Sequence, residues 1–316
     1  MYYNSLNSYL RSEFGCKVYK LALQGGTTCP NRDGTVGTGG CIFCRGGSGD
    51  FTAYNDDVRK EIEAAKLKVK NKIQSGKYIA YFQSYSATYG DIERQKERFF
   101  SAINEPSIAA LSIATRPDCL EKKVLDILSE LNLIKPVWVE LGLQTIHEST
   151  AQYIRRGFDL ECYTDAVAEL HKRNIDVVTH MIIGLPFETE QMIYDTAAFI
   201  GNMRSEGIKF HLLHVLSGTD LETEYKSGIF TLPTLEEYTR LLIGCIRRIP
   251  ESTVIHRLTG DGNKKYLIAP EWSADKKHVL NYITSEFKKQ NLIQGDLIIK
   301  IPESSNFGKW EDSGFL

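Results

Sequence analysis

The stretch TTCPNRDGTVGTGGCIFC, residues 27–44, determines the interpretation of this chain. It contains Cys29, Cys41 and Cys44, and four glycines lie between the first two. Three thiolates so placed can converge on one soft centre, an iron–sulfur cluster or a zinc ion, and glycines let the backbone wrap closely around it. A structural zinc site needs a fourth Cys or His, and none follows at finger spacing. The stretch therefore favours a catalytic iron–sulfur cluster with one open position.

Composition sets the class of protein. The chain has 316 residues, of which 42% are hydrophobic and 25% charged, with a formal net charge of −2. These values are typical of a globular domain and provide no broad positive field, so we do not expect a DNA-binding protein. The first 15 residues lack the apolar core of a signal peptide, and no apolar run approaches the roughly 20 residues that span a bilayer. Seven cysteines without an export signal indicate reduced thiols in the cytoplasm.

Strand and helix patterns alternate along the chain. Apolar runs typical of buried strands cover residues 17–23, 78–85, 108–114, 137–143, 177–183 and 209–215. Helical periodicity covers residues 56–73, 91–103, 121–131, 160–173, 190–204, 235–248 and 276–289. Six strand–helix units predict an α/β fold, a partial (β/α)6 TIM-type barrel with a parallel sheet. We expect the barrel to cover residues 1–253, with residues 254–316 as a C-terminal extension packed on it.

The predicted strands end in polar or glycine-rich segments. In a barrel of this kind the carboxyl ends of parallel strands share one rim, where chemistry gathers. The cysteine loop follows the first strand, and the other strands end in 83–86 (QSYS), 115–118 (TRPD), 140–145 (ELGLQT), 184–186 (GLP) and 217–219 (SGT). Together they predict one site around the cysteines.

In order along the chain, CPNRDG, CIFC, TRPD, ELGLQT, RRGF and IIGLP resemble the landmarks of the radical SAM superfamily over about residues 15–260. The long first spacer between cysteines is similar to the subgroup that includes the radical SAM subunit of Elongator. Within it, the chain resembles the compact YhcC/YtqA-like (MnmL-type) family. It is too short for the acetyltransferase-like domain of the Elongator subunit.

The resemblance implies a set of cofactor contacts. Cys29, Cys41 and Cys44 would hold a [4Fe–4S] cluster whose fourth iron binds S-adenosyl-L-methionine (SAM). Reductive cleavage of SAM would give a 5′-deoxyadenosyl radical that abstracts hydrogen from an unreactive C–H bond. The implied SAM contacts are Phe43 and the backbone around Ile183 near the adenine, Gln83, Ser84 and Tyr85 in place of the usual glycine-rich segment, Glu140 and Gln144 near the ribose and methionyl group, and Arg156 with the carboxylate.

Several of these residues have a second interpretation. Glu140 could form an internal salt bridge instead of a ligand contact, and Arg116 and Arg156 could form surface ion pairs. His180, His211 and His214 are expected to be core or rim histidines rather than ligands. The lysine pairs at 264–265, 276–277 and 288–289 are expected to be solvated, with an RNA-facing patch as the alternative. Whether Cys119 or Cys162 joins the chemistry stays open.

Three functions compete. The resemblance favours a tRNA-modifying enzyme that converts a 5-carboxymethylaminomethyl(-2-thio) wobble uridine into its 5-aminomethyl form. The anticodon loop would then be its partner, and flavodoxin or ferredoxin a suitable electron donor. Unstacked anticodon bases could enter the barrel mouth and stack on aromatics such as Phe51, Tyr85 and Tyr89. The alternatives are a radical enzyme acting on a small metabolite and a non-enzymatic metal-binding scaffold, which the polar rim disfavours.

Overall fold

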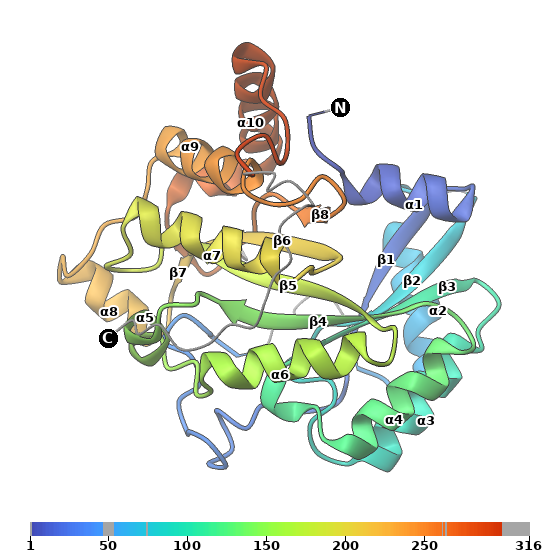
Figure 1. Cartoon of the computed structure of the whole chain (residues 1–316). Coiled ribbons are helices and arrows are strands. Elements are labelled where there is room, and N and C mark those ends of the chain that lie inside the picture. The colour runs from blue at the N-terminus through green and yellow to red at the C-terminus, as the bar shows by residue number, and fades with distance from the viewer. Residues whose placement is uncertain (1, 47–53, 74, 261, 263, 299–316) are drawn as a thin grey trace, which may run out of the picture.

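The computed structural model describes residues 2–46, 54–73, 75–260, 262 and 264–298. Seven parallel strands form one curled sheet in the order β1-β2-β3-β4-β5-β6-β8, with helices on its outer face (Figure 1). The predicted α/β partial barrel is thereby confirmed. No helix in this described part of the chain combines the length and apolar character that crossing a membrane would require.

The elements follow the predicted alternation closely, except that no helix was predicted for residues 6–14, where α1 lies. The strands of the large sheet are β1 (Val18–Leu23), β2 (Lys77–Phe82), β3 (Ile108–Thr115), β4 (Val137–Gln144), β5 (Asp176–Ile183), β6 (Gly207–Leu212) and β8 (Val254–Arg257). The longer helices are α1 (Leu6–Phe14), α2 (Val58–Val69), α3 (Ile92–Ile103), α4 (Lys122–Asn132), α6 (Leu160–His171), α7 (Glu190–Asn202), α9 (Leu235–Ile246) and α10 (Lys276–Gln290).

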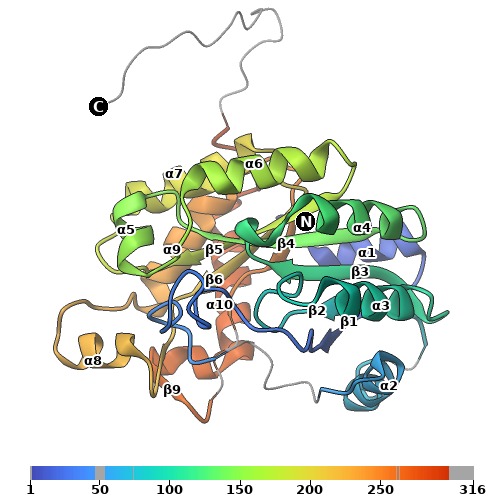
Figure 2. The same ribbon diagram turned by 90° about the horizontal axis from the view of Figure 1, so that it is seen from below.

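The main core lies between the sheet and the helices outside it (Figure 2). All eight residues of β3 are buried, as expected for a parallel strand covered on both faces. Phe82 at the end of β2 meets Phe99 of α3 edge-on, with ring centroids 4.9 Å apart. Each fully buried side chain of this size contributes roughly 1.5 to 3 kcal/mol to folding. This outer core fixes the strands and therefore the rim.

The sheet has one strand more than the six predicted units. The seventh, β8, pairs with β6, so the sheet continues past the boundary that we predicted after residue 253. It escaped the pattern because it has only four residues and ends in His256 and Arg257. Its position depends on pairing with the free edge of β6, a tertiary contact that the local sequence pattern does not reveal. The division into barrel and extension stays a prediction.

Several short elements near the rim were also missed. They are α5 (Glu148–Tyr153), α8 (Asp220–Lys226) and the antiparallel pair of β7 (Val215–Leu216) and β9 (Leu267–Ala269). Each has seven residues or fewer, which is too short for a helical or strand period to stand out. Together they enlarge the rim beside the cysteine loop.

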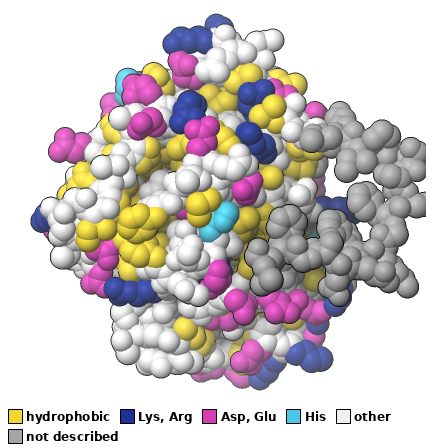
Figure 3. Space-filling view, turned by 60° about the vertical axis from the view of Figure 1, so that its left-hand side comes forward, with side chains coloured by type: hydrophobic (Ala, Val, Ile, Leu, Met, Phe, Trp, Pro, Cys, Tyr) yellow, Lys and Arg dark blue, Asp and Glu magenta, His cyan; other side chains and the backbone are white. Residues whose placement is uncertain are grey.

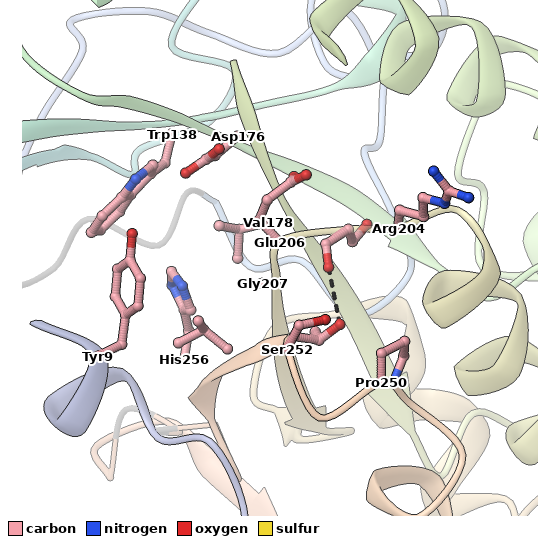
Figure 4. Close-up of a pocket in the computed structure, with 13 residues that line it drawn as sticks. Tyr9, Trp138, Asp176, Val178, Arg204, Glu206, Gly207, Pro250, Ser252 and His256 are labelled. Carbon is pink, nitrogen blue, oxygen red and sulfur yellow. Dashed lines mark hydrogen bonds between the residues drawn. The ribbon is translucent and has the colours of Figure 1, made fainter. Parts of the chain in front are cut away.

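Helix α1 covers the opposite, amino-terminal end of the strands. Leu10 packs there against inward-facing residues of the sheet, among them Trp138 and Val178. Beside it lies a cavity of about 500 Å³, shown in Figure 4, whose wall includes Tyr9, Trp138, Asp176, Glu206 and His256. The cavity is therefore at the other end of the barrel from the cysteines.

Asp176 borders this cavity and should make stability depend on pH. Burial, followed by the nearby charge of Glu206, raises the pKa of Asp176 to about 6 from 3.8. The folded state therefore binds a proton more readily than the unfolded chain, so ionised Asp176 destabilises the protein above pH 6. At 1.36 kcal/mol per pKa unit, discounted for partial exposure, Asp176→Asn should stabilise by about 1 to 2 kcal/mol at pH 7.5.

Urea unfolding at pH 7.5 and pH 4 measures this effect. The gain of Asp176→Asn should shrink as pH falls from 6 toward 4, where folded Asp176 is protonated and the unfolded side chain, with an ordinary pKa of 3.8, is becoming protonated. The exposed Asp195, changed to Asn, is the matched control. Equal gains at both pH values would contradict the assignment.

Candidate functional site

The cysteine loop lies at the carboxyl ends of the strands and is folded by its own backbone. Residues 24–46 contain no regular helix or strand, and in Figure 2 this blue segment lies beside α5. The Arg32 amide donates to the Cys29 carbonyl at 2.8 Å, and the Gly40 amide donates to the Asn31 carbonyl at 2.6 Å. Gly40 has a φ of +75°, and a Cβ there would lie 2.9 Å from the Arg32 Nε. A larger residue at position 40 would therefore open the loop.

Asn31 ties the loop to the segment that follows α5. Its buried side-chain amide donates to the Arg155 carbonyl at 2.6 Å and to the Cys41 Sγ at 3.6 Å. The Ile42 amide also donates to the Ile154 carbonyl, at 3.2 Å. The position of Cys41 is thus set by two chain segments more than a hundred residues apart.

The three cysteines are free thiols, each only partly buried. Burial raises the pKa of Cys41 to about 11, the charges of Cys44 and Cys29 add to it, and Arg116 and Asn31 oppose it. The three sulfurs are thus close enough to interact. Among the described residues, however, no three Cys, His, Asp or Glu side chains could hold one metal ion. Three thiolates without a fourth ligand fit a cluster with one open position better than a structural zinc ion, which needs four ligands.

Arg116 brings a fixed positive charge beside these thiols. Its guanidinium bonds both oxygens of Asp118, at 2.8 and 2.7 Å, and the carbonyls of Arg156 and Gly157, at 2.8 and 3.3 Å. Burial opposes its charged form, yet Asp118 raises the pKa of Arg116, and Cys29 adds to this. Arg116 is therefore a buried ion-pair partner facing the cysteine loop rather than a surface charge.

The predicted adenine neighbours lie on two sides of β5. Phe43 packs on a small apolar cluster with Ile182, Leu185 and Leu213. Ile183 is fully buried in the main core, and its carbonyl accepts from the Leu213 amide at 3.0 Å. Only backbone atoms of Ile183 could face a ligand, which is the kind of contact that the resemblance implied.

The end of β2 returns toward the cysteine loop. The Gln83 amide donates to the Leu23 carbonyl at 3.2 Å, and Ser84 is buried. Tyr85 has a left-handed φ of +53° and a side chain that is 37% exposed. A Cβ on Gly46 would lie 3.7 Å from the Tyr85 hydroxyl. The predicted trio is thus beside the loop, with Tyr85 turned to the surface.

Gln144 closes β4 with an unusual backbone. Its φ is +69°, and its side-chain amide nitrogen would lie 2.8 Å from a Cβ on Gly142. The side chain therefore folds over the glycine that precedes it by two residues, on the inner face of the rim. Left-handed backbone at a non-glycine residue costs of order 1 to 3 kcal/mol and clusters at functional sites.

Arg156 does not point a free guanidinium toward a ligand. The residue is 2% exposed, and its guanidinium donates to the carbonyls of Thr145 at 2.7 Å, Phe158 at 2.9 Å and Leu143 at 3.3 Å. It also lies 3.4 Å from the Glu148 carboxylate. Contrary to the expected pairing with the SAM carboxylate, Arg156 holds the turn after β4 by satisfying its carbonyls.

Glu140 likewise forms the internal ion pair that was its second interpretation. Its carboxylate is fully buried and bonds Lys20 at 2.8 Å, His180 at 2.8 Å, Ser112 at 2.5 Å and also Lys209. Burial alone would raise the pKa of Glu140, but the two lysines outweigh it and hold that pKa well below 4.5. With both oxygens occupied inside the barrel, Glu140 has no free lone pair aimed at a ribose.

The histidines follow the expectation only in part. His180 is bound by Glu140, and burial lowers the pKa of His180 to about 4, so it is neutral. The His211 ring lies 5.0 Å from that of His180, and its buried Nε2 has no hydrogen-bond partner among the described residues. His214 lies next to Gly260, where a Cβ would be 3.2 Å from its ring. His211 is thus not a satisfied core histidine.

The remaining candidates at the rim are two cysteines and two aromatic residues. Burial raises the pKa of Cys119 to about 12 and of Cys162 to about 11, which keeps both as inert thiols near pH 7. The Tyr89 hydroxyl bonds the Thr35 hydroxyl at 2.8 Å, so it supports the cysteine loop. Phe51 lies outside the described residues.

Sequence reasoning missed the charged interior of the barrel. Lys20, Lys209, His256 and Arg257 line it, yet the patterns gave them no role. The available signal was a charged residue at an inward-facing position of a buried strand, which is costly unless paired.

Two family models match the chain. The radical SAM superfamily model matches residues 27–200, and a radical SAM C-terminal domain matches residues 205–289. The uncharacterized protein YtqA of Bacillus subtilis is 43% identical over 305 residues, 96% of this chain and 95% of that protein. Protein YhcC of Escherichia coli is 34% identical over 86% of this chain and 88% of its own.

More distant relatives include the Elongator complex protein 3. The Schizosaccharomyces pombe protein is 26% identical over 70% of this chain and 48% of its own length. Among solved structures, archaeal Elp3 of Methanocaldococcus infernus aligns with a TM-score of 0.67 at 17% identity, covering 88% of this chain and 64% of that one. This structural likeness shows a shared fold.

The geometry of Glu140 generates a test of its role. Glu140→Gln leaves Lys20 and Lys209 without their carboxylate, so it should destabilise the protein by about 3 to 5 kcal/mol in urea unfolding. The control is Glu148→Gln, whose half-exposed carboxylate lies 3.4 Å from Arg156 and should cost under about 1 kcal/mol. Unchanged stability with weaker SAM binding would instead restore Glu140 as a ligand.

Proposed function

The chain belongs to the radical SAM superfamily, and we propose that Cys29, Cys41 and Cys44 hold its [4Fe–4S] cluster. The cofactors of this superfamily, the cluster and SAM, supply radical chemistry at an unreactive C–H bond when bound. The observation that carries the assignment is a three-thiol loop beside the carboxyl ends of the strands, within the stretch that the radical SAM superfamily model matches. The residues present therefore fit the cluster.

The chain's own residues would support the cluster and SAM. Asn31 donates to the sulfur of Cys41, and Arg116 places a positive charge near Cys29 and Cys41. Such outer contacts orient ligands and tune a metal centre. For SAM we propose Phe43 and the backbone at Ile183 beside the adenine. We also propose contacts from the Gln83–Tyr85 segment and from Gln144, with Arg156 shaping the turn behind them.

Cysteine substitutions test the cluster. Cys29→Ala, Cys41→Ala and Cys44→Ala should each abolish the uptake of about four irons per chain and the thiolate-to-iron absorption after anaerobic reconstitution. Cys245→Ala, a buried thiol in α9, should keep both. Reduced wild type should also release 5′-deoxyadenosine from SAM. One tightly bound zinc with no iron uptake would refute the assignment.

For the substrate we propose a tRNA wobble uridine with a 5-carboxymethylaminomethyl group, converted into its 5-aminomethyl form. Support comes from similarity to Elongator complex protein 3 over 266 residues. On the face in Figure 3, Lys and Arg side chains are scattered among Asp and Glu. Recognition would then rest on few phosphate contacts and on one base held at the rim, where Tyr85 is exposed.

The second candidate is a radical enzyme acting on a small metabolite, which the formal net charge of −2 favours.

With tRNA as substrate we place the protein in the cytoplasm, with a flavodoxin or ferredoxin as electron donor. Basic side chains beside the loop, such as Arg45 stacked 3.4 Å over the Tyr266 ring, are suitable RNA contacts.

Nucleoside mass spectrometry of bulk tRNA separates the two candidates. A strain lacking the protein should lose the aminomethyl-derived wobble nucleosides and accumulate the carboxymethylaminomethyl precursor. The purified enzyme should bind that tRNA with a shallow salt dependence, since each phosphate contact adds only about 0.7 to 0.9 to the log–log slope. An unchanged nucleoside profile, with SAM cleavage stimulated by a small-molecule extract but not by tRNA, would select the metabolite.

A further inference from the structure

The interior of the half-barrel holds more basic than acidic side chains. Lys20 from β1 and Lys209 from β6 both bond the single carboxylate of Glu140. Lys209 also donates to the Tyr81 hydroxyl at 3.0 Å. Burial, together with the mutual repulsion of these cations, lowers the pKa of Lys209 well below 10.5. One carboxylate therefore faces two lysines before any further charge is counted.

Arg257 adds a third cation to this interior. It is the register partner of Lys209 across an irregularity in the β6–β8 pairing, and it is half-buried. Among the described residues, the ion pairs of Glu140 are those with Lys20, His180 and Lys209, so Arg257 is not one of its partners. After burial, its charge is among the causes that lower the pKa of Lys20, His180 and His211, so it faces the same space.

Among the described residues, His211 brings a polar atom without a partner close to these groups, because its ring lies 5.0 Å from that of His180. In β6 it lies two residues after Lys209, on the same face and one step nearer the rim. In the described part of the chain its buried Nε2 has no hydrogen-bond partner. Leaving such a group unsatisfied costs about 1 to 3 kcal/mol, so its retention calls for an explanation.

The interior is not sealed. The side chain of Lys20 is 17% exposed and that of His180 is 16% exposed, although both contact the buried Glu140. A small polar group could therefore reach this layer. Because the basic side chains outnumber the carboxylates, the group that fits is an anion with oxygen acceptors.

We propose that the half-barrel interior binds a carboxylate of the substrate, with Arg257 as its counter-ion and His211 Nε2 as a hydrogen-bond donor. The inference deepens the proposed function and rests on it, because the carboxymethylaminomethyl group ends in a carboxylate. The carboxylate of SAM is a separate group, which the open iron would take. Arg257 and His211 would thus distinguish the acid substrate from the amine product.

Calorimetric titration of the reconstituted, SAM-saturated enzyme tests this with two probes. They are the nucleoside 5-carboxymethylaminomethyluridine and its carboxamide, which keeps the secondary amine but lacks the carboxylate charge. The wild type should prefer the acid at least tenfold, and Arg257→Gln should reduce the preference below threefold. Arg257→Lys should retain part of it. The control is Arg248→Gln, whose guanidinium lies 4.0 Å over Tyr194 and donates to the Gly244 carbonyl; it should keep the full preference.

Thermal unfolding of the ligand-free protein provides a second measurement that a purely structural role would not explain. Removing a cation from this basic interior should raise the unfolding temperature of Arg257→Gln, whereas loss of a structural arginine would lower it. SAM affinity should not change.

Three outcomes would overturn the inference: equal binding of acid and amide, no binding of either, or an acid preference that survives in Arg257→Gln. None of them depends on tRNA. If the acid preference holds and tRNA does not stimulate SAM cleavage, the carboxylate site stands and the tRNA proposal falls. If tRNA is modified and the preference is absent, the reverse holds.

Discussion

The burial of one carboxylate, that of Glu140, constrains the whole barrel. A buried charge is tolerated only when partners surround it, and here those partners come from β1, β3, β5 and β6. Strands that are not neighbours in the sheet are thereby drawn toward one point, which favours a curled sheet over a flat one. The helices outside supply most of the apolar burial, while this polar centre sets the curvature on which the rim depends.

The rim is built from the same principle, with backbone carbonyls in place of carboxylates. The Arg116 guanidinium donates to carbonyls of the turn that follows α5, and the Arg156 guanidinium donates to carbonyls of the turn that follows β4. Asn31 then joins these turns to the cysteine loop. The cysteines are held by a rigid frame of charged and amide side chains, so the open position of the cluster can be specified although its loop has no helix or strand.

Local sequence predicted the features that have local causes. The six longer strands, the longer helix that follows each of them and the cysteine loop carry periodic or spacing signals, and each was found. The partners of Glu140 and Arg156 carry no such signal, because they lie on other strands or are backbone carbonyls, which every residue has. For the same reason β8 was missed, since only the edge of β6 makes its four residues a strand. The interior cations were visible in the sequence as charged residues in buried strands. That they gather in one interior depends on how the strands curl, which the local sequence does not show.

The pairing of β8 also determines when the two ends of the barrel can come together during synthesis. Ser5 forms a β-bridge with Ile255, and the Ile255 amide donates to the Asn4 carbonyl at 2.7 Å. Residues near the start therefore cannot form these contacts until residues near 255 have been synthesised. At synthesis rates of about 5 to 20 residues per second, the ribosome needs roughly 13 to 50 s to reach Arg257. Strand β6 is complete at Leu212, so its edge has no partner while the next 45 residues are made, which takes about 2 to 9 s. A nascent chain with a free strand edge is a natural client for chaperones.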